Sequence, residues 1–205
     1  MNQKAEKGQA TRRLIVETAR GLFAARGYAE VSIEQVLRAS GVSRGALYHH
    51  FAGKEALFEA VVEAMAIEVA KKVVARSTGA RDVRVGLAAG CDAFLELTRD
   101  PAVRQIVLTD APSVLGWARW REIDARHGFG LLKASLARAS AEGALPAELI
   151  EPFAHMLLAS LTEVALMIAR AGADADAAQR GKAAAHALME RMLGPAAPQM
   201  RKIHG

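Results

Sequence analysis

The sequence predicts an all-α protein, and three observations support this. Ala accounts for 44 of the 205 residues, and it is the best helix former. Aromatic residues make up only 5%, and all six Pro lie after residue 100, which is unlike a β-sandwich or a disordered chain. Apolar residues recur at helical spacing along most of the chain, and no segment shows the alternating pattern of a strand.

Length and composition exclude several classes of protein. By size scaling, a chain of 205 residues buries about 70% of its surface on folding, so it needs no disulfide or metal to hold a core. Its single cysteine, Cys91, excludes an intrachain disulfide framework and a Cys-based zinc site. The N-terminus has no apolar signal core, and polar residues interrupt the most apolar run, residues 157–169. We expect a cytoplasmic protein that does not span a membrane.

The positive charge is concentrated near the N-terminus. Residues 1–55 contain nine Lys and Arg against five Asp and Glu, a net charge of +4, whereas residues 56–205 contain 18 against 17. A basic module on a nearly neutral body suits an anionic polymer such as DNA as partner. A solvated basic arm would show the same charge.

Three helices are expected in the basic module. The first two, residues 11–26 and 33–39, each have one apolar face, and Ser32 and Gln35 form a capping box before the second. The turn Ser40-Gly41-Val42 then leads into the third helix. Two short helices joined by a Gly-containing turn are the helix-turn-helix signature, whose second helix enters the DNA major groove.

The third helix, residues 43–51, divides into two sides on a helical wheel. Leu47 and Phe51 share the inner side, and the outer side combines small residues with side chains that can bind DNA. Small residues let the helix approach base edges, and an arginine can pair bidentately with guanine. Tyr and His suit phosphate oxygens, as do the backbone N–H groups at helix N-termini. An ordinary corner of two helices with exposed polar residues remains the alternative.

The run from Gly21 to Val62 resembles the DNA-binding domain of the tetracycline-repressor (TetR) family. The matching marks are Phe23-x-x-x-Gly27-Tyr28, Ser32-Ile33, Ala39-Ser40-Gly41-Val42-Ser43, Leu47-Tyr48-His49-His50-Phe51 and Lys54-Glu55-x-Leu57. The resemblance implies that the positions matching Ser32, Ser43, Arg44, Tyr48, His49 or His50, and Lys54 contact operator DNA. With the small residues of the outer side, the predicted DNA-binding set is Ser32, Ser43, Arg44, Gly45, Ala46, Tyr48, His49, His50 and Lys54.

Six further helices are expected after the basic module. Apolar spacing and the positions of Pro and Gly place them at about residues 54–77, 83–98, 101–109, 114–142, 146–171 and 176–193. Asp176 and Gln179 have the spacing of a second capping box. This agrees with the family plan of about nine helices. We expect a DNA-binding domain at residues 1–55, an effector-binding and dimerisation domain at 56–195, and a flexible tail at 196–205.

The last two helices are expected to form a dimer interface. Residues 146–171 are apolar around most of the helix, which a monomer core explains on one face and a partner helix explains on a second. The resemblance also implies dimerisation through these helices, although simple core packing is an alternative. The predicted interface residues are Met156, Ala159, Ser160, Glu163, Met167, Ala184, Ala187 and Leu188.

A small-molecule pocket is expected in the C-terminal domain, because apolar pockets with a few polar groups are the usual ligand sites. Aromatic residues with polar neighbours mark it, although each could equally be ordinary core or surface. The predicted lining residues are Cys91, Phe94, Asp110, Trp117, Trp120, Arg121, His127 and His155.

These features predict a ligand-responsive, sequence-specific DNA-binding regulator that binds a pseudo-palindromic operator as a homodimer, most simply as a repressor. G-x-S-x-G, H-E-x-x-H and P-loop motifs are absent, so no enzymatic activity or cofactor is expected. His49 and His50 are adjacent and therefore do not form an i, i+4 metal chelate. The alternatives are a ligand-independent DNA-binding regulator, controlled by abundance or by a protein partner, and a helical adaptor without DNA binding.

Overall fold

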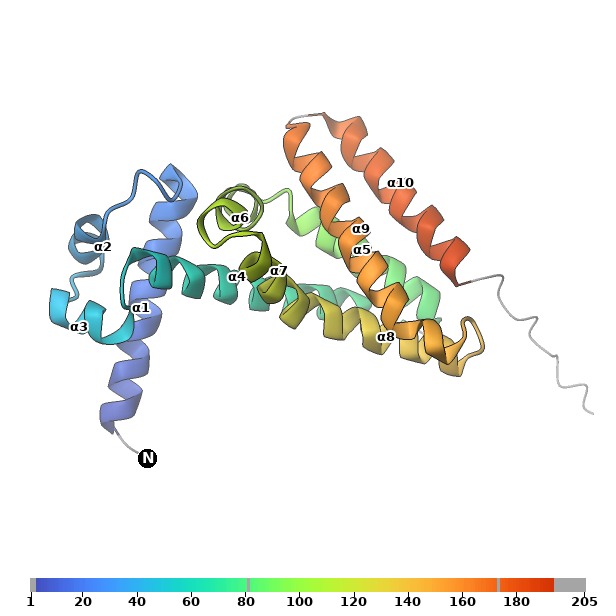
Figure 1. Cartoon of the computed structure of the whole chain (residues 1–205), viewed down its shortest axis with the longest axis horizontal. Coiled ribbons are helices and arrows are strands. Elements are labelled where there is room, and N and C mark those ends of the chain that lie inside the picture. The colour runs from blue at the N-terminus through green and yellow to red at the C-terminus, as the bar shows by residue number, and fades with distance from the viewer. Residues whose placement is uncertain (1–2, 81, 173, 194–205) are drawn as a thin grey trace, which may run out of the picture. The chain divides into compact units, whose positions relative to one another are not determined.

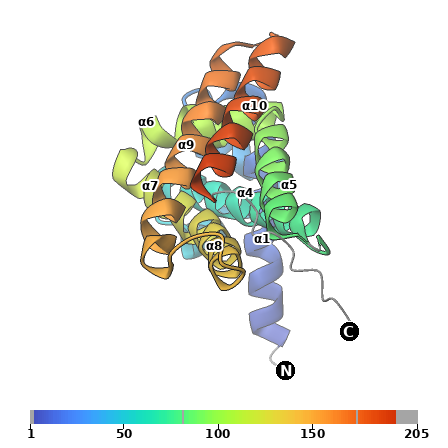
Figure 2. The ribbon, with the colours of Figure 1, turned by 90° about the vertical axis from the view of Figure 1, so that its right-hand side faces the viewer.

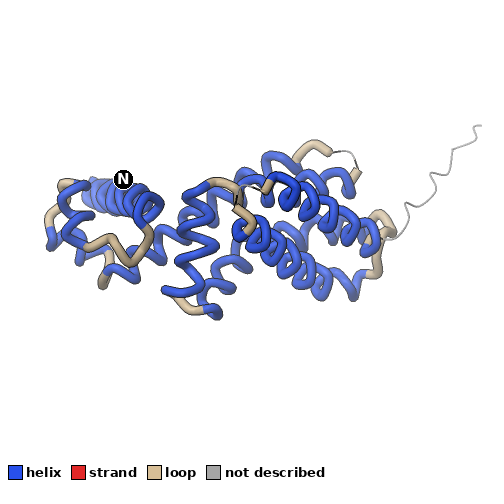
Figure 3. The backbone as a smooth tube through the Cα atoms, turned by 90° about the horizontal axis from the view of Figure 1, so that it is seen from above, coloured by secondary structure: helices blue, strands red, loops and turns tan. Residues whose placement is uncertain are grey.

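The computed structural model of the chain describes residues 3–80, 82–172 and 174–193, and within these ranges it contains helices, turns and loops but no strand (Figures 1 and 3). Counted as uninterrupted runs, the described residues form nine helices. The predicted all-α fold is therefore confirmed. The tail predicted at residues 196–205 lies outside the described residues.

The helices follow one another along the chain with short connections. Their bounds are α1 Gln3–Arg26, α2 Ile33–Ser40, α3 Arg44–His50, α4 Lys54–Ser77, α5 Val83–Leu97, the π-helix η1 Val103–Asp110, α6 Ala111–Val114, α7 Trp117–Asp124, the π-helix η2 Ala125–Phe129, α8 Gly130–Ala141, the 3-10 turn η3 Ala147–Leu149, α9 Ile150–Arg170 and α10 Ala175–Met192.

The chain forms two compact units. The first combines residues 1–69 and 96–126, and the second combines residues 70–95 and 127–205. The first therefore contains α1 to α3, most of α4, η1, α6 and α7, while the second contains α8, α9, α10 and most of α5. This division does not test whether the first three helices fold alone, so the domain boundary expected at residue 55 stays a prediction.

In the first unit, α1 packs against α2, α3 and η1. Its side chains Ile15 and Phe23 are fully buried, as are Leu47 of α3 and Phe58 of α4. The Phe23 and Phe58 rings meet edge to face, with centroids 5.1 Å apart. Burying such rings excludes water from the core and makes the positions of these helices depend on one another.

Helix α1 begins at Gln3, eight residues before the start expected from apolar spacing. The sequence there is rich in Lys, Ala, Glu and Gln, which have high helix propensity. Residues 5–10 bury no side chain, so apolar periodicity gives no sign of these first two turns of the helix.

In the second unit, α9 packs against α8 and α10, and Figure 2 shows α9 and α10 side by side. Gly181 of α10 permits this approach, because a Cβ atom there would lie 2.8 Å from Val164 Cγ1 and 3.0 Å from Ile168 Cδ1. The second capping box was predicted wrongly: Asp174, not Asp176, caps α10, and its carboxylate accepts the backbone N–H groups of Asp176 and Ala177.

Within the described ranges, one helical stretch, Ala147–Arg170, has the length and apolar composition needed to cross a membrane. Eight of its side chains are buried, including Leu157, Leu161 and Ala165. Packing against α8 and α10 accounts for these buried side chains, as in other core helices.

Two expected helices differ in detail. The one expected at 101–109 is mostly the π-helix η1, and its wider turn is accompanied by a hydrogen bond from the Thr109 hydroxyl to the Arg104 carbonyl at 2.9 Å. The one expected from residue 114 begins at Trp117, because Gly116 has φ of 77° and interrupts the helix.

Candidate nucleic-acid interface

Both helices of the helix-turn-helix begin at capping residues, as the sequence predicts. The Ser32 hydroxyl accepts the Gln35 backbone N–H at 3.2 Å, and the Gln35 side chain accepts the Ser32 backbone N–H at 2.7 Å. Gly41 follows α2 with φ of 68°, a left-handed conformation that glycine adopts without steric cost. The Ser43 hydroxyl accepts the Ala46 backbone N–H at 3.3 Å. Local hydrogen bonds therefore determine where α2 and α3 start.

Helix α3 has a buried side and an exposed side. Leu47 and Phe51 are buried, whereas Gly45, Tyr48 and His49 are exposed. The predicted division of this helix is confirmed. An exposed side that begins with glycine and carries Arg, Tyr and His can approach base edges and can donate hydrogen bonds to bases and phosphates.

The remaining predicted DNA-binding residues flank this side. Ser32 and Ser43 are exposed, while Ala46 and His50 are half-buried. The His50 ring meets the His49 ring edge to face, with centroids 5.2 Å apart. The α2–α3 unit therefore brings together every predicted DNA-binding residue except Lys54, although the structure contains no DNA to test their roles.

Lys54 is the first residue of α4, and its ammonium group has partners within the protein. The Nζ atom lies 4.1 Å from the centroid of the Tyr28 ring and donates to the Ala29 carbonyl at 3.3 Å. Partial burial lowers the pKa of Lys54 below its ordinary value, although the nearby Glu30 carboxylate opposes the shift. The ammonium group has three N–H donors, so it can also bind a phosphate while it stays on the Tyr28 ring.

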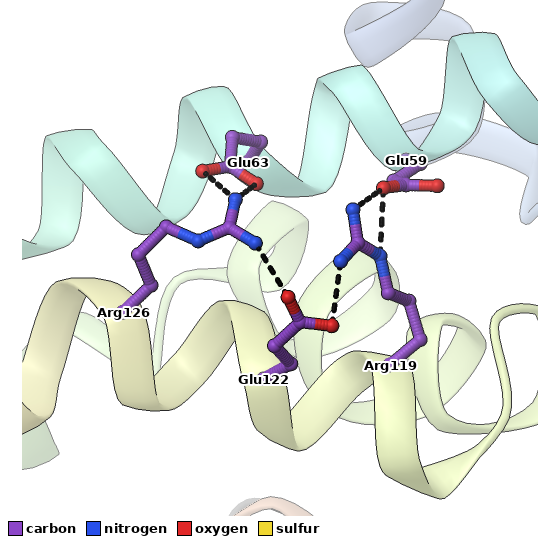
Figure 4. A network of polar contacts seen from close by, with 5 residues as sticks. All are labelled: Glu59, Glu63, Arg119, Glu122 and Arg126. Carbon is purple, nitrogen blue, oxygen red and sulfur yellow. Dashed lines mark hydrogen bonds and ion pairs between the residues drawn. The ribbon is translucent and has the colours of Figure 1, made fainter.

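Five charged side chains connect α4 to α7 and η2: Glu59, Glu63, Arg119, Glu122 and Arg126 (Figure 4). Arg119 pairs with Glu59 and also with Glu122 at 2.6 Å. Arg126 donates to both Glu63 oxygens at 3.0 Å and to Glu122 at 2.9 Å. Hydrogen bonds from Arg119 and then Arg126 lower the pKa of Glu122. Sequence reasoning missed this network, although its members have helical i, i+3 and i, i+4 spacing.

Asp110, predicted to line a ligand pocket, has partners at the end of η1. Its carboxylate accepts the Tyr28 backbone N–H at 2.8 Å and the Gln105 side-chain amide at 3.0 Å. Gly27, just before Tyr28, has φ of 76°, and a Cβ atom there would lie 3.3 Å from Gln105. Asp110 therefore ties the turn after α1 to η1, whatever its part in ligand binding.

The other pocket residues of the first unit are on α7. Trp117 is 60% exposed, and its ring lies 4.8 Å from that of the buried Trp120, measured between centroids. Arg121 pairs with Asp124 at 3.0 Å.

The pocket residues of the second unit also have separate surroundings. Buried Cys91 contacts the Met189 sulfur at 3.3 Å, and burial raises the pKa of its thiol to about 12. Phe94 and His127 are half-buried, and exposed His155 stands against Phe129 with centroids 4.2 Å apart. The eight pocket residues are divided equally between the two units, so the pocket stays a prediction. A search of the described residues found no group of three His, Cys, Asp or Glu side chains that could hold a metal.

The predicted dimer residues lie on the outer sides of α9 and α10. Met156 and Met167 are 53% and 43% exposed, and Ala159, Glu163 and Ala184 are also exposed. Ser160, Ala187 and Leu188 are half-buried. No partner chain is present, so the interface stays a prediction.

A capped helix-turn-helix with an exposed recognition side, followed by a larger helical body, defines a class of DNA-binding transcriptional regulators. Residues 15–61 match the model of the bacterial regulatory proteins of the tetR family, and residues 85–193 match that of the tetracyclin repressor-like C-terminal domain. The chain belongs to the TetR family and is a helix-turn-helix transcriptional regulator.

Individual relatives agree with this assignment. A TetR-family transcriptional regulator from Pectobacterium atrosepticum is 31% identical, with a TM-score of 0.82 over 96% of this chain and 100% of that one. The HTH-type transcriptional repressor Rv1474c of Mycobacterium tuberculosis is 34% identical over 53% of this chain and 57% of its own length. The transposon Tn10 TetC protein of Escherichia coli is 25% identical over 71% of this chain and 74% of its own length.

Proposed function

We propose that this regulator is a ligand-responsive repressor that binds a pseudo-palindromic operator as a homodimer. The DNA-binding part of the proposal rests on the two sides of α3. Leu47 and the C-cap residue Phe51 are buried, whereas Arg44, Gly45 and Tyr48 are exposed. Such a helix can lie in a major groove with its small residues against the base edges. Repression is favoured by the 34% identity to a relative named as a repressor.

Each predicted contact has a distinct role in this proposal. Arg44 reads guanine, because its planar fork of N–H groups matches the O6 and N7 acceptors. Tyr48, His49 and His50 bind phosphate oxygens. Ser32, Ser43 and Lys54 bind phosphates where three helices begin, since the backbone N–H groups there also favour an anion.

The exposed apolar side chains of the second unit support the proposed dimerisation. Met156 and Met167 are about three turns apart on α9, so they lie on the same side of the helix. Both are exposed, although large apolar side chains are normally buried. A second copy of α9 and α10 would cover them in a two-fold interface. Two recognition helices related by a two-fold axis read two inverted half-sites, which is why the operator is expected to be pseudo-palindromic.

Effector control is proposed to act through α4. This helix is continuous from Lys54 to Ser77 and contributes residues to both compact units. Glu59 binds it to Arg119 of α7, and Glu63 binds it to Arg126 of η2. An effector that prefers one position of α4 would shift the population of dimers towards that state and change the half-site spacing. We expect the protein to act in the cytoplasm, without a cofactor and without enzymatic activity.

The DNA-binding proposal is tested by selecting an operator from random duplexes and measuring its affinity by electrophoretic shift at fixed salt. Replacing Arg44 by Ala removes one contact from each half-site, so it should weaken the selected operator at least about 30-fold and relax the preference at one position of each half-site. Replacing Arg76 by Ala is the control and should leave affinity unchanged, because Arg76 is an exposed residue in the last turn of α4, outside the α2–α3 unit. A protein that selects no sequence would instead be the helical adaptor.

Dimerisation is tested by measuring the molar mass of the protein by light scattering as it elutes from a size-exclusion column. Replacing both Met156 and Met167 by Glu should give a monomer, because four carboxylates would be buried in the interface. Replacing Val85, an exposed apolar residue of α5 outside the predicted interface, by Glu is the matched control and should remain a dimer. Two monomeric variants, or two dimeric ones, would contradict the assignment of the interface.

Effector control is tested with compounds that raise the melting temperature in a thermal-shift screen, since a ligand of the native state stabilises it. Such a compound should lower operator affinity. If every stabilising compound leaves operator affinity unchanged, the release mechanism is wrong and the ligand-independent regulator is the better description.

A further inference from the structure

The guanidinium of Arg44 has a partner on the neighbouring helix. Its Nη2 atom lies 2.7 Å from Oε1 of Glu34, so an ion pair joins the first turn of α2 to the first residue of α3. Only one guanidinium nitrogen makes this contact. A guanidinium has five N–H donors, so Arg44 retains enough of them to pair bidentately with guanine while Glu34 stays bound.

Local hydrogen bonds fix the backbone at both residues of the ion pair. The capping box of Ser32 and Gln35 holds the first turn of α2, and Ser43 caps α3 immediately before Arg44. A long arginine side chain ordinarily loses rotamer freedom when it binds DNA. Arg44 is already oriented by Glu34, so part of that loss has occurred before the DNA arrives.

Stability does not explain the pair. The side chains of Arg44 and Glu34 are 60% and 58% exposed, and exposed ion pairs contribute little to folding. A cation at a helix N-terminus is also opposed by the helix dipole. The pKa of Glu34 lies below its ordinary value, because a backbone N–H and then Arg44 hydrogen-bond to the carboxylate, so Glu34 is charged at neutral pH.

A charged carboxylate at this place affects phosphates and bases differently. It neutralises Arg44 and repels a phosphate that approaches the same guanidinium, so Arg44 contributes little to binding of arbitrary sequences. Guanine O6 and N7 are neutral acceptors, which a carboxylate repels far less. Glu34 therefore reserves Arg44 for base edges.

Resting on the proposed entry of α3 into the major groove, we propose that Glu34 is a specificity-determining residue, which positions Arg44 for guanine and withholds it from phosphate. Glu34 acts through Arg44 and is not itself a base contact. The negative charge of Glu34 lowers the affinity for DNA of any sequence. Pairing of Arg44 with guanine offsets this loss of affinity only at the operator.

The test compares the wild type with Glu34→Gln, which has nearly the same shape but no charge, on the selected operator and on a duplex of scrambled sequence. For the scrambled duplex, freeing one cation in each subunit of the proposed dimer should make the plot of log affinity against log salt steeper by about 1.8 and raise affinity about 30-fold at 0.15 M salt. Operator affinity should rise less, so the specificity ratio should fall. Glu17→Gln, an exposed acid of α1 that pairs with Arg20, is the control and should change both affinities equally.

The same measurements in an Arg44→Ala background show whether Glu34 acts through Arg44. We expect Glu34→Gln to have no further effect on the specificity ratio there. An effect that persists without Arg44, or a Glu34→Gln variant that keeps the wild-type ratio, overturns the inference while leaving the DNA-binding proposal intact. A wild type that prefers no sequence overturns both.

Discussion

Replacing Gly181 by Ala should destabilise the second unit, even though Ala is the better helix former. In an open helical position this exchange stabilises by about 1 kcal/mol. At Gly181 the new methyl group would lie 2.8 Å from Val164 Cγ1 and 3.0 Å from Ile168 Cδ1. Val164 is β-branched and has a restricted χ1 angle, so it cannot simply turn aside.

Overpacking of this kind costs about 1–3 kcal/mol, which equals or exceeds the gain in helix propensity. The net expectation is therefore a loss of about 0–2 kcal/mol. Gly130 of α8 is the matched control, because it is exposed in the same unit and a Cβ atom there has no neighbour within 4 Å. Gly130→Ala should raise stability by about 1 kcal/mol, so the two variants should differ by about 1–3 kcal/mol.

Thermal unfolding at one fixed protein concentration measures this difference, since dimerisation makes the melting temperature depend on concentration. For a chain of this size, 1 kcal/mol corresponds to about 2–4 °C. Adding Val164→Ala should relieve the clash, so Gly181→Ala should cost less in that background. If Gly181→Ala stabilises the protein as much as Gly130→Ala, or costs the same with and without Val164, the close approach of α9 and α10 is not the reason for the glycine.

Three substitutions and one chemical modification test other parts of the structure. Ser32→Ala removes a helix cap and should cost about 1 kcal/mol in urea unfolding, whereas Ser32→Thr should cost less. Asp110→Ala leaves the Tyr28 backbone N–H without its acceptor and should lower the free energy of unfolding by about 1–2 kcal/mol. Asp110→Asn can still accept this hydrogen bond and should destabilise the protein less. Equal losses of stability in the two variants would contradict this role of Asp110. Lys54→Met keeps the packing on the Tyr28 ring but removes one charge from each subunit of the proposed dimer. It should weaken operator and scrambled DNA alike and lower the salt slope by about 2. Burial raises the pKa of the Cys91 thiol to about 12, so only about one molecule in ten thousand should carry the thiolate at pH 8. The thiol should therefore resist alkylation in the native protein and react in urea. Rapid alkylation of the native protein would contradict its burial.

Local sequence determined the helix-turn-helix. The Ser32–Gln35 box and the Ser43 cap each involve residues three apart, and the left-handed turn needs only Gly41. Such interactions are complete within a few residues, so the start of α2 and of α3 could be predicted without knowing the rest of the chain. The buried Leu47 likewise follows from helical periodicity alone.

Local patterns were insufficient where two residues offered the same signal. Asp174 and Asp176 can both cap α10, and only Asp174 does. Trp117 and Trp120 are three residues apart on one helix, yet one is exposed and the other buried. The two members of each pair have the same residue type and lie close together in the sequence. Residue type and spacing therefore could not show which Asp caps α10 or which Trp is buried.

The sequence by itself therefore determined the all-helical fold, the recognition helix and its outer face, because caps and periodicity operate over one or two helical turns. Only the tertiary structure decided the partners of the charged side chains. Asp110 meets Tyr28 across 82 residues, Glu59 meets Arg119 across 60, and Glu34 meets Arg44 across a helix and a turn. Exposed Glu and Arg residues are too common for their order in the chain to specify which of them pair; pairing depends on which helix faces pack together, and the buried side chains of the core decide that.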